Sequence, residues 1–280
     1  MTSAKLAPPS GNNRGSLVCV GTGMTLGSHL TPLARSQIEQ ADVVFALVPD
    51  RIAEMWLERM NPDVRSLQPY YQDGQSRMST YRQWVELLLG EVRAGKRVCG
   101  VFYGHPGIFA WSPHKAIEAA RAEGFQAHME PGISAEDCLY ADLGIDPGRY
   151  GCQHFEASQL LMYERVIDPT GYLVLWQVVL VGDMSLKRFA TGPTYRQLLV
   201  DVLSRDYPLQ HDIILYRAPT LPVQQAQISH ITLGELPHAQ LTEEMTVVLP
   251  PMAALKPNLA MRKRLADLDQ SGVFDDKHNS

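Results

Sequence analysis

Features that mark membrane-spanning, secreted or nucleic-acid-binding proteins are missing from this chain of 280 residues. The longest apolar run, residues 172–182 with Gln177 inside it, is too short to cross a bilayer. The first 15 residues are polar and contain no apolar stretch typical of a signal peptide. The net charge of -5 indicates no basic surface for nucleic acid or an anionic membrane. We therefore expect a cytoplasmic protein that binds neither nucleic acid nor membrane.

Cysteine is also scarce. The four cysteines contain no pair at CxxC spacing, which favours reduced core thiols over disulfides or a metal site. No Walker A motif is present, which argues against a phosphate-cradling NTPase. No serine or cysteine stands in the glycine-flanked turn of a hydrolase nucleophile. The chemistry therefore has to come from other residue types, and we expect no bound metal.

Short apolar strands alternate with helices over the first half of the chain. The strands are expected at residues 17–20, 43–47, 98–102 and 126–129. Helix starts are marked by Thr31 followed by Pro32, and by Ser134 with Asp137 at capping-box spacing. This alternation predicts an α/β fold whose first sheet is mostly parallel and covered on both faces.

Turn residues cluster at 146–148, and the pattern changes beyond them. Strands at 172–181, 212–216 and 246–249, with a helix over 195–204, predict a second α/β domain with a mixed sheet. The expected divisions are a disordered tail over 1–15, an N-terminal domain over 16–147, a C-terminal domain over 148–251, and a tail over 252–280 with a short helix at 259–268.

Three glycine-containing loops follow the carboxyl ends of strands in the first domain. They lie at residues 21–23, 103–107 and 131–135. In an open α/β sheet small ligands bind beyond those ends, and glycines allow the backbone to approach them closely. Any one of these loops is equally well a simple tight turn, but three at successive strand ends favour a ligand site.

A second candidate feature is a group of phenols near an arginine. Arg77 and Tyr81 are four residues apart and share a face if a helix begins by Ser76, while Tyr71 precedes them and Tyr103 lies in the second glycine loop. Phenols and a guanidinium can bind an amide oxygen and stabilise charge that develops there. The competing interpretation is that Tyr81 packs in the core and Arg77 is solvated.

These loops resemble the tetrapyrrole-methylase superfamily of methyltransferases that use S-adenosylmethionine (SAM). The resemblance rests on VGTGMTLGSHLTPLARSQIEQADVV, PGISAEDCLYADLGID and LYRAPTLP, and it extends from about residue 15 to 251. It implies the two-domain tetrapyrrole-methylase fold, with SAM as cofactor, S-adenosylhomocysteine as product, and a SAM cleft between the domains. His105 replaces the acidic residue usual in the second loop, which lowers the expectation of a porphyrinoid substrate.

Within that superfamily the chain is most similar to borosin peptide α-N-methyltransferases of the omphalotin type. The residues that carry this resemblance are YYQDGQSRMSTY, VFYGHPGIFA, FEASQ and LVLWQVVLVG. It implies catalytic roles for Arg77, Tyr81 and Tyr103, with Tyr71 assisting. It also implies a set of SAM contacts: Tyr103, His105, Ile108, Phe109, Ser134, Ala135, Gln177, Tyr216, Ala218, Met245 and Thr246.

The resemblance also bears on the substrate. Omphalotin-type enzymes carry a Val/Ile/Gly-rich substrate segment after the methyltransferase, and residues 265–280 contain none. The chain therefore resembles the split kind, which implies a homodimer that N-methylates a separate ribosomal precursor peptide.

The mechanism expected from this resemblance is removal of the amide proton by Tyr81, made more acidic by Arg77. Tyr71 and Tyr103 then bond the carbonyl oxygen. Two alternatives stay open. One is methylation of a tetrapyrrole, a precorrin or another small molecule, and the other is a non-catalytic module that binds SAM or a peptide.

Overall fold

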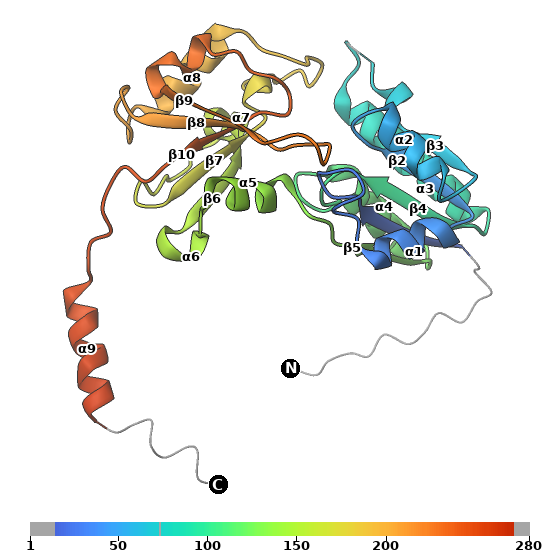
Figure 1. The fold of residues 1–280 in the computed structure, drawn as a ribbon, viewed down its shortest axis with the longest axis horizontal. Helices are drawn as coiled ribbons and strands as arrows, with labels where there is room; N and C mark the ends of the chain where they lie inside the picture. The colour runs from blue at the N-terminus through green and yellow to red at the C-terminus, as the bar shows by residue number, and fades with distance from the viewer. Residues whose placement is uncertain (1–14, 73, 272–280) are drawn as a thin grey trace.

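Two five-stranded sheets, formed one after the other along the chain, build the two lobes of this computed structural model (Figure 1). The structure describes residues 15–72 and 74–271. Most of the tail predicted over residues 1–15 therefore lies outside the described residues. No helix in the described part of the chain is both long and apolar enough to cross a membrane.

The first sheet is entirely parallel, as the strand–helix alternation predicted. Its order is β3-β2-β4-β1-β5. The strands are β1 (Ser16–Gly21), β2 (Val43–Leu47), β3 (Val64–Ser66), β4 (Arg97–Phe102) and β5 (Gln126–Glu130). Because successive residues of a strand point to opposite faces, Leu17 and Cys19 enter one core layer while Val18 and Val20 enter the other.

Helices cover both faces of this sheet. On one face lie α1 (Pro32–Gln40) and α2 (Arg51–Glu58), and on the other lie α3 (Arg77–Arg93) and α4 (Trp111–Ala122). The Thr31 side chain caps α1 and Pro32 is its first residue, as predicted. The side chains of Trp84, Leu88 and Val92 fix α3 on the sheet, so the first turn of that helix projects past the carboxyl ends of the strands.

The second sheet is mixed, again as predicted, with the order β6-β7-β10-β8-β9. Strands β6 and β7 are parallel and the remaining neighbours are antiparallel. The strands are β6 (Cys152–Glu156), β7 (Tyr172–Trp176), β8 (Asp212–Arg217), β9 (Gln227–Thr232) and β10 (Thr246–Leu249). Strands β6 and β9 are additional to those expected from the sequence.

Helices also cover this second sheet. One face packs on α7 (Ala157–Met162), α8 (Pro193–Leu203) and the 3-10 helix η3 (Leu233–His238). The other face packs on α5 (Ala135–Leu143), which begins with the predicted capping box of Ser134 and Asp137. A short helix, α6 (Pro147–Tyr150), contains the predicted domain boundary and lies between the two sheets along the chain.

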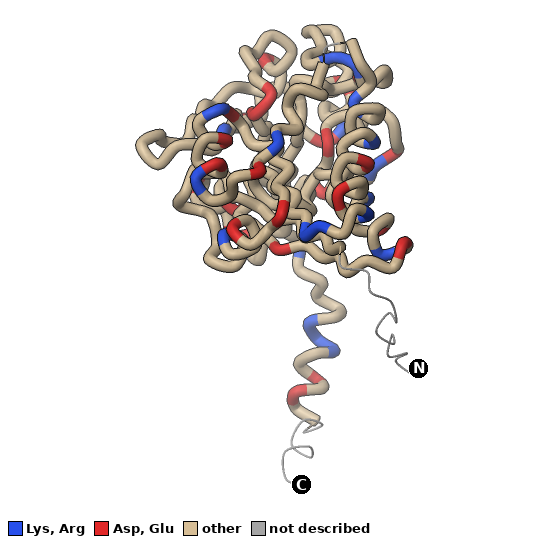
Figure 2. Tube along the Cα trace, turned by 90° about the vertical axis from the view of Figure 1, so that its right-hand side faces the viewer, with Lys and Arg blue, Asp and Glu red and all other residues tan. Residues whose placement is uncertain are grey.

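The strand predicted over residues 172–181 is wrong in its second half. Strand β7 ends at Trp176, Gln177 adopts a left-handed conformation with φ 56°, and Val178–Leu180 form the 3-10 helix η2. Val178 and Val181 are buried like the strand residues before them, so the apolar pattern on both sides of Gln177 gave no sign that the backbone changes direction there. The last helix, α9 (Leu259–Gln270), agrees with the helix expected at 259–268 and extends away from both lobes (Figures 1 and 2).

Candidate functional site

The three glycine loops meet at the carboxyl edge of the first sheet. Gly23 and Gly104 exchange two backbone hydrogen bonds, of 3.1 and 2.9 Å. Gly21 and Gly132 approach so closely that a Cβ atom on either would lie 2.3 Å from the carbonyl oxygen of Gly104. Glycine is required at these positions because the loops pack backbone against backbone. The convergence predicted from the sequence is therefore present.

Tyr103 stands at this edge, immediately after β4. Its backbone N–H donates to the carbonyl of Leu47, the last residue of β2, at 3.0 Å. The residue is 51% exposed, yet burial, together with the nearby Tyr81 phenol and Glu243 carboxylate, raises the pKa of its phenol. The two observations are compatible, because water can reach a side chain that protein atoms nevertheless surround. Tyr103 therefore stays accessible to a ligand, and its side chain is expected to remain a neutral hydroxyl.

Tyr71 and Tyr81 form a hydrogen-bonded phenol pair. Tyr71 follows the 3-10 helix η1 (Gln68–Tyr70), Tyr81 lies in the second turn of α3, and their hydroxyl oxygens are 3.0 Å apart. Both rings pack on Trp84, with centroids 5.5 and 5.3 Å away. Burial, together with the Tyr81 hydroxyl, raises the pKa of Tyr71 well above its usual value. The two rings thus pack against the hydrophobic core of the first lobe, while their hydroxyl groups lie together at the edge of that core.

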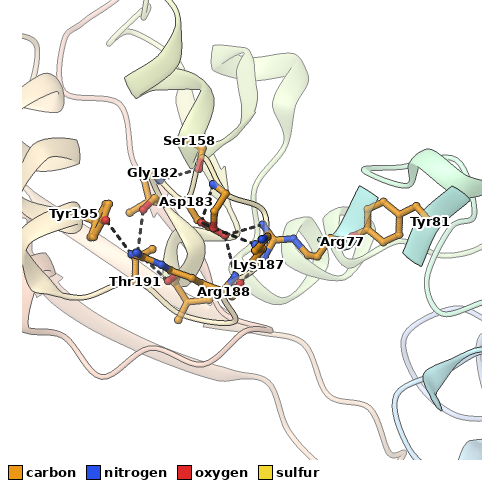
Figure 3. A network of polar contacts seen from close by, with 12 residues as sticks. Arg77, Tyr81, Ser158, Gly182, Asp183, Lys187, Arg188, Thr191 and Tyr195 are labelled. Carbon is orange, nitrogen blue, oxygen red and sulfur yellow. Dashed lines mark hydrogen bonds and ion pairs between the residues drawn. The ribbon is translucent and has the colours of Figure 1, made fainter. Parts of the chain in front are cut away.

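Arg77 joins the two lobes. Its backbone N–H donates to the carbonyl of Leu186 at 2.8 Å, and its guanidinium donates to the carbonyl of Arg188 and pairs with Asp183 at 3.5 Å. Figure 3 shows the side chain reaching away from Tyr81 toward Asp183. The side chain is only 13% exposed, so the alternative of a solvated arginine is wrong. Arg77 instead holds the 182–191 loop of the second lobe.

Asp183 organises that loop from inside. Its carboxylate accepts hydrogen bonds from the backbone N–H and hydroxyl of Ser185, at 3.1 and 2.5 Å, and from the backbone N–H of Arg188 at 3.1 Å. Burial alone would raise the pKa of this carboxyl, but these hydrogen bonds and the Arg77 charge hold it below its usual value. The same loop carries Phe189, whose ring centroid lies 5.7 Å from that of Tyr71.

The edge of the second sheet brings together several of the residues assigned to the cofactor. Thr246 pairs with Tyr216, and its neighbour Val247 pairs with Leu175 of β7, so the end of β7, the end of β8 and the start of β10 coincide. Gln177, Ala218 and Met245 adjoin these positions. The two lobes touch near this edge, where the rings of Phe109 and Trp176 lie 5.6 Å apart.

Not every assigned side chain points outward. Tyr216 is buried and its hydroxyl donates to Asp142 at 2.7 Å. The Ser134 hydroxyl is used in the cap of α5, and Thr246 is 4% exposed. The His105 ring accepts the backbone N–H of Gly107 at 2.9 Å, which is the local turn bond typical of a histidine in a tight loop. By contrast, Ile108 and Phe109, just after this loop, are 36% and 43% exposed, and Ala135 is half-buried at the start of α5.

Three residues at this site were not assigned from the sequence. Asp183 and Phe189 lie in a loop whose sequence contains no motif, so no local signal marks them. Glu156 lies within the FEASQ segment, which was noted only as part of a resemblance. It ends β6 beside Trp176, and burial raises the pKa of its carboxyl while the Arg77 charge opposes that rise.

Solved structures define the class of fold to which this chain conforms. The uroporphyrin-III-C-methyltransferase of Thermus thermophilus superposes with a TM-score of 0.59 at 18% identity, over 85% of this chain and 93% of that one. Cobalt precorrin-4 methyltransferase superposes with a TM-score of 0.61 at 15% identity, over 86% and 97%. At this identity the likeness shows the two-lobed α/β methyltransferase fold alone.

The chain belongs to the tetrapyrrole (corrin/porphyrin) methylase family, which its residues 16–237 match. Enzymes of this family use SAM. Curated relatives include a methyltransferase/type I borosin cyclic peptide precursor of Coprinopsis marcescibilis, 41% identical over 85% of this chain and 63% of that protein. The omphalotin A precursor of Omphalotus olearius is 39% identical over 94% and 64%. The chain therefore spans less than two thirds of the length of these relatives.

Proposed function

We propose that this chain is a SAM-dependent methyltransferase that N-methylates backbone amides of a separate peptide. The observation that carries the proposal is the phenol pair of Tyr71 and Tyr81, whose hydroxyl oxygens lie 3.0 Å apart, near the Arg77 charge and the Tyr103 hydroxyl. Family membership supports SAM as the methyl donor. The relatives named as precursors of ribosomally synthesised cyclic peptides support a peptide as the acceptor.

An amide nitrogen is a poor nucleophile because its lone pair is delocalised into the carbonyl group. Negative charge must therefore grow on the carbonyl oxygen as the nitrogen loses its proton. Neutral hydroxyls aimed at that oxygen stabilise this charge. We assign this donation to Tyr71, Tyr81 and Tyr103, because burial raises the pKa values of Tyr71 and Tyr103 and keeps those phenols protonated.

In this proposal Arg77 positions a loop, whereas from the sequence it was expected to make Tyr81 more acidic. Its guanidinium is paired with Asp183 and with the Arg188 carbonyl, so its charge is largely committed to the second lobe. We propose that it positions the 182–191 loop, with Phe189, against Tyr71. The ring packing of Tyr71 then aims its hydroxyl, and Arg77 supplies a positive field to the site.

The residues at the lobe junction fit SAM, which carries positive charge and no phosphate. The amino end of α5, where a phosphate could otherwise bind, is already occupied by the Asp137 carboxylate, which accepts from the backbone and hydroxyl of Ser134 at 2.7 Å. Exposed apolar groups of Ile108 and Phe109 offer a surface for an adenine ring. When bound, SAM supplies an electrophilic methyl group. We propose that SAM contacts all of the residues assigned to it from the sequence: Tyr103, His105, Ile108, Phe109, Ser134, Ala135, Gln177, Tyr216, Ala218, Met245 and Thr246.

The test is incubation of the protein with SAM and a panel of synthetic Val/Ile/Gly-rich peptides, followed by tandem mass spectrometry. Methyl groups located on backbone nitrogens are the expected result. Tyr81→Phe keeps the ring that packs on Trp84 but removes the hydroxyl, and it should lower the rate by roughly 10²–10³ while SAM binding persists. Tyr70→Phe is the matched control, because the Tyr70 ring packs on the same core without a role in the proposal.

Three results would contradict the proposal. Methylation of uroporphyrinogen but of no peptide would favour the small-molecule reading. SAM binding without transfer to any acceptor would favour a non-catalytic module. Equal activity of Tyr81→Phe and the wild type would remove the phenol pair from the mechanism. We also propose a homodimer, and sedimentation of the full chain as a monomer at micromolar concentration would contradict it.

A further inference from the structure

Glu156 occupies a position at the lobe junction that the mechanism above does not use. It is the last residue of β6 and lies beside Trp176, the last residue of β7. Side chains alternate along a strand, so Glu156 shares a face with His154, while Phe155 packs into the core on the opposite face. His154 contacts Tyr140 of α5 and Trp176. Trp176 in turn packs on Phe109 of the first lobe, with ring centroids 5.6 Å apart, so this face is turned toward that lobe.

The Glu156 carboxylate is half-buried and unengaged. Within residues 15–72 and 74–271, no hydrogen bond or ion pair joins its side chain to another group. Asp183 differs, because three donors and the Arg77 pair saturate it. Ser158, two residues after Glu156, accepts the backbone N–H of Gly182 at 2.9 Å, so the end of β6 lies against the loop that Arg77 holds. The Arg77 charge also acts on the Glu156 carboxyl. A polar group that is partly removed from water and lacks a protein partner can accept a bond from a ligand.

We propose that Glu156 is the general base that removes the proton from the substrate amide, an assignment that rests on the proposed function. In this step the N–H bond breaks and its proton moves to a carboxylate oxygen of Glu156. The nitrogen electron pair forms the new N–CH₃ bond, and the C–S electron pair stays on sulfur. One negative carboxylate and one positive sulfonium become two neutral groups, so charge balances and no uncompensated charge stays in the half-buried site.

The alternative base, a phenol, is less suited to the task. Burial raises the pKa values of Tyr71 and Tyr103, so few of these phenols are ionised near neutral pH. Burial also raises the pKa of Glu156, but an ordinary carboxyl starts from a much lower value than a phenol. A raised pKa makes a carboxylate a stronger base.

The experiment compares Glu156→Gln with the wild type in single turnover on the best peptide of the panel. We expect a rate loss of roughly 10²–10⁴, the usual contribution of a general base. Peptide affinity in the presence of S-adenosylhomocysteine should change less than about threefold, because glutamine preserves the shape. Glu243→Gln is the matched control: Glu243 also responds to the Arg77 charge but is exposed, and its variant should keep its rate within about threefold.

The pH profile provides a readout that a merely structural role would not move. Arg77 on α3 is the charged group that acts on Glu156, and Arg77 is itself paired with Asp183 in the 182–191 loop. On its own strand, Glu156 shares a face with His154, which lies 3.5 Å from Glu136 of α5. The wild-type rate should rise as pH increases through the Glu156 pKa, and Glu156→Asp should shift that limb while retaining partial activity. Carbon-13 NMR of the glutamate carboxyls, with the Glu156 signal identified by its loss in Glu156→Gln, measures the pKa without turnover.

Several outcomes would overturn the assignment. A Glu156→Gln rate within threefold of the wild type, or a pH profile identical in both, would show that another group takes the proton. Lost peptide binding in Glu156→Gln, or an equal rate loss in Glu243→Gln, would make the carboxyl a general electrostatic contributor. These failures require an active wild type, whereas absence of peptide methylation by the wild type refutes the proposed function itself.

Discussion

Replacement of Asp183 by alanine should release the 182–191 loop from the first lobe. Asp183 is the buried partner of Arg77, and the two side chains are 2% and 13% exposed. The change removes an acceptor from two backbone N–H groups, one hydroxyl and one guanidinium. The loop then keeps the bonds at its two ends, from Gly182 to Ser158 and from Thr191 to Val179, but loses those that hold its middle. Arg77 keeps only its bonds to the carbonyls of Leu186 and Arg188.

The expected size of this effect follows from burial. Removal of one partner of a buried ion pair costs about 3–5 kcal/mol. Arg77 retains a carbonyl partner and some solvent contact, so the lower limit, about 3 kcal/mol, applies. This loss of free energy lowers the cost of opening the 182–191 loop locally, and it leaves the stability of the two hydrophobic cores unchanged. Because 1.4 kcal/mol is a factor of ten, the open population of the loop should rise roughly 100-fold.

Hydrogen exchange measured by mass spectrometry is the assay, with peptides that contain Arg77 and residues 182–191. Asp168→Ala is the matched control, because Asp168 forms a similar turn with Thr170, at 2.9 and 2.7 Å, on the exposed surface and without an arginine. Exchange in Asp183→Ala that stays within threefold of the wild type would refute the reasoning.

The same prediction has a pH dependence. The Asp183 pKa is lowered, so its stabilisation is complete above the ordinary carboxyl value of 3.8 and is lost as pH falls through the lower folded value. Loop exchange in the wild type, corrected for intrinsic rates, should therefore rise at acid pH. In Asp183→Ala this rise should be absent.

Further predictions concern the glycine edge and the core. Gly132→Ala would place a Cβ 2.3 Å from the Gly104 carbonyl oxygen, and a loss of about 1–3 kcal/mol or more is expected in urea denaturation. Gly90→Ala is its control: it lies in α3 with open space around it, so a gain of about 0.5–1 kcal/mol is expected. Burial raises the pKa of Cys19 to about 12, so iodoacetamide at pH 8 should modify Cys19 in urea but not in the native protein, and native modification would contradict this.

Local signals made much of the first lobe predictable. The Thr31 cap with Pro32, and the Ser134 capping box with Asp137, act over three residues, and both are present where the sequence indicated. The apolar strands of the first sheet are continuous because helices bury both of their faces. The same reasoning failed at Gln177, since burial on its own does not distinguish a strand from a strand followed by a 3-10 turn.

Among the catalytic candidates, too, some features were predictable from the sequence and others were not. The spacing of Arg77 and Tyr81 on one helix, and the glycines at successive strand ends, follow from chain-local periodicity and turn chemistry. The partners of these residues do not. Asp183 meets Arg77, and the Arg77 charge acts on Glu156, because the two lobes, formed by distant segments of the chain, are in contact. Contacts between residues so far apart along the chain produce no periodic pattern in the sequence. They can therefore be identified only from the tertiary structure, in which both lobes are folded and in contact.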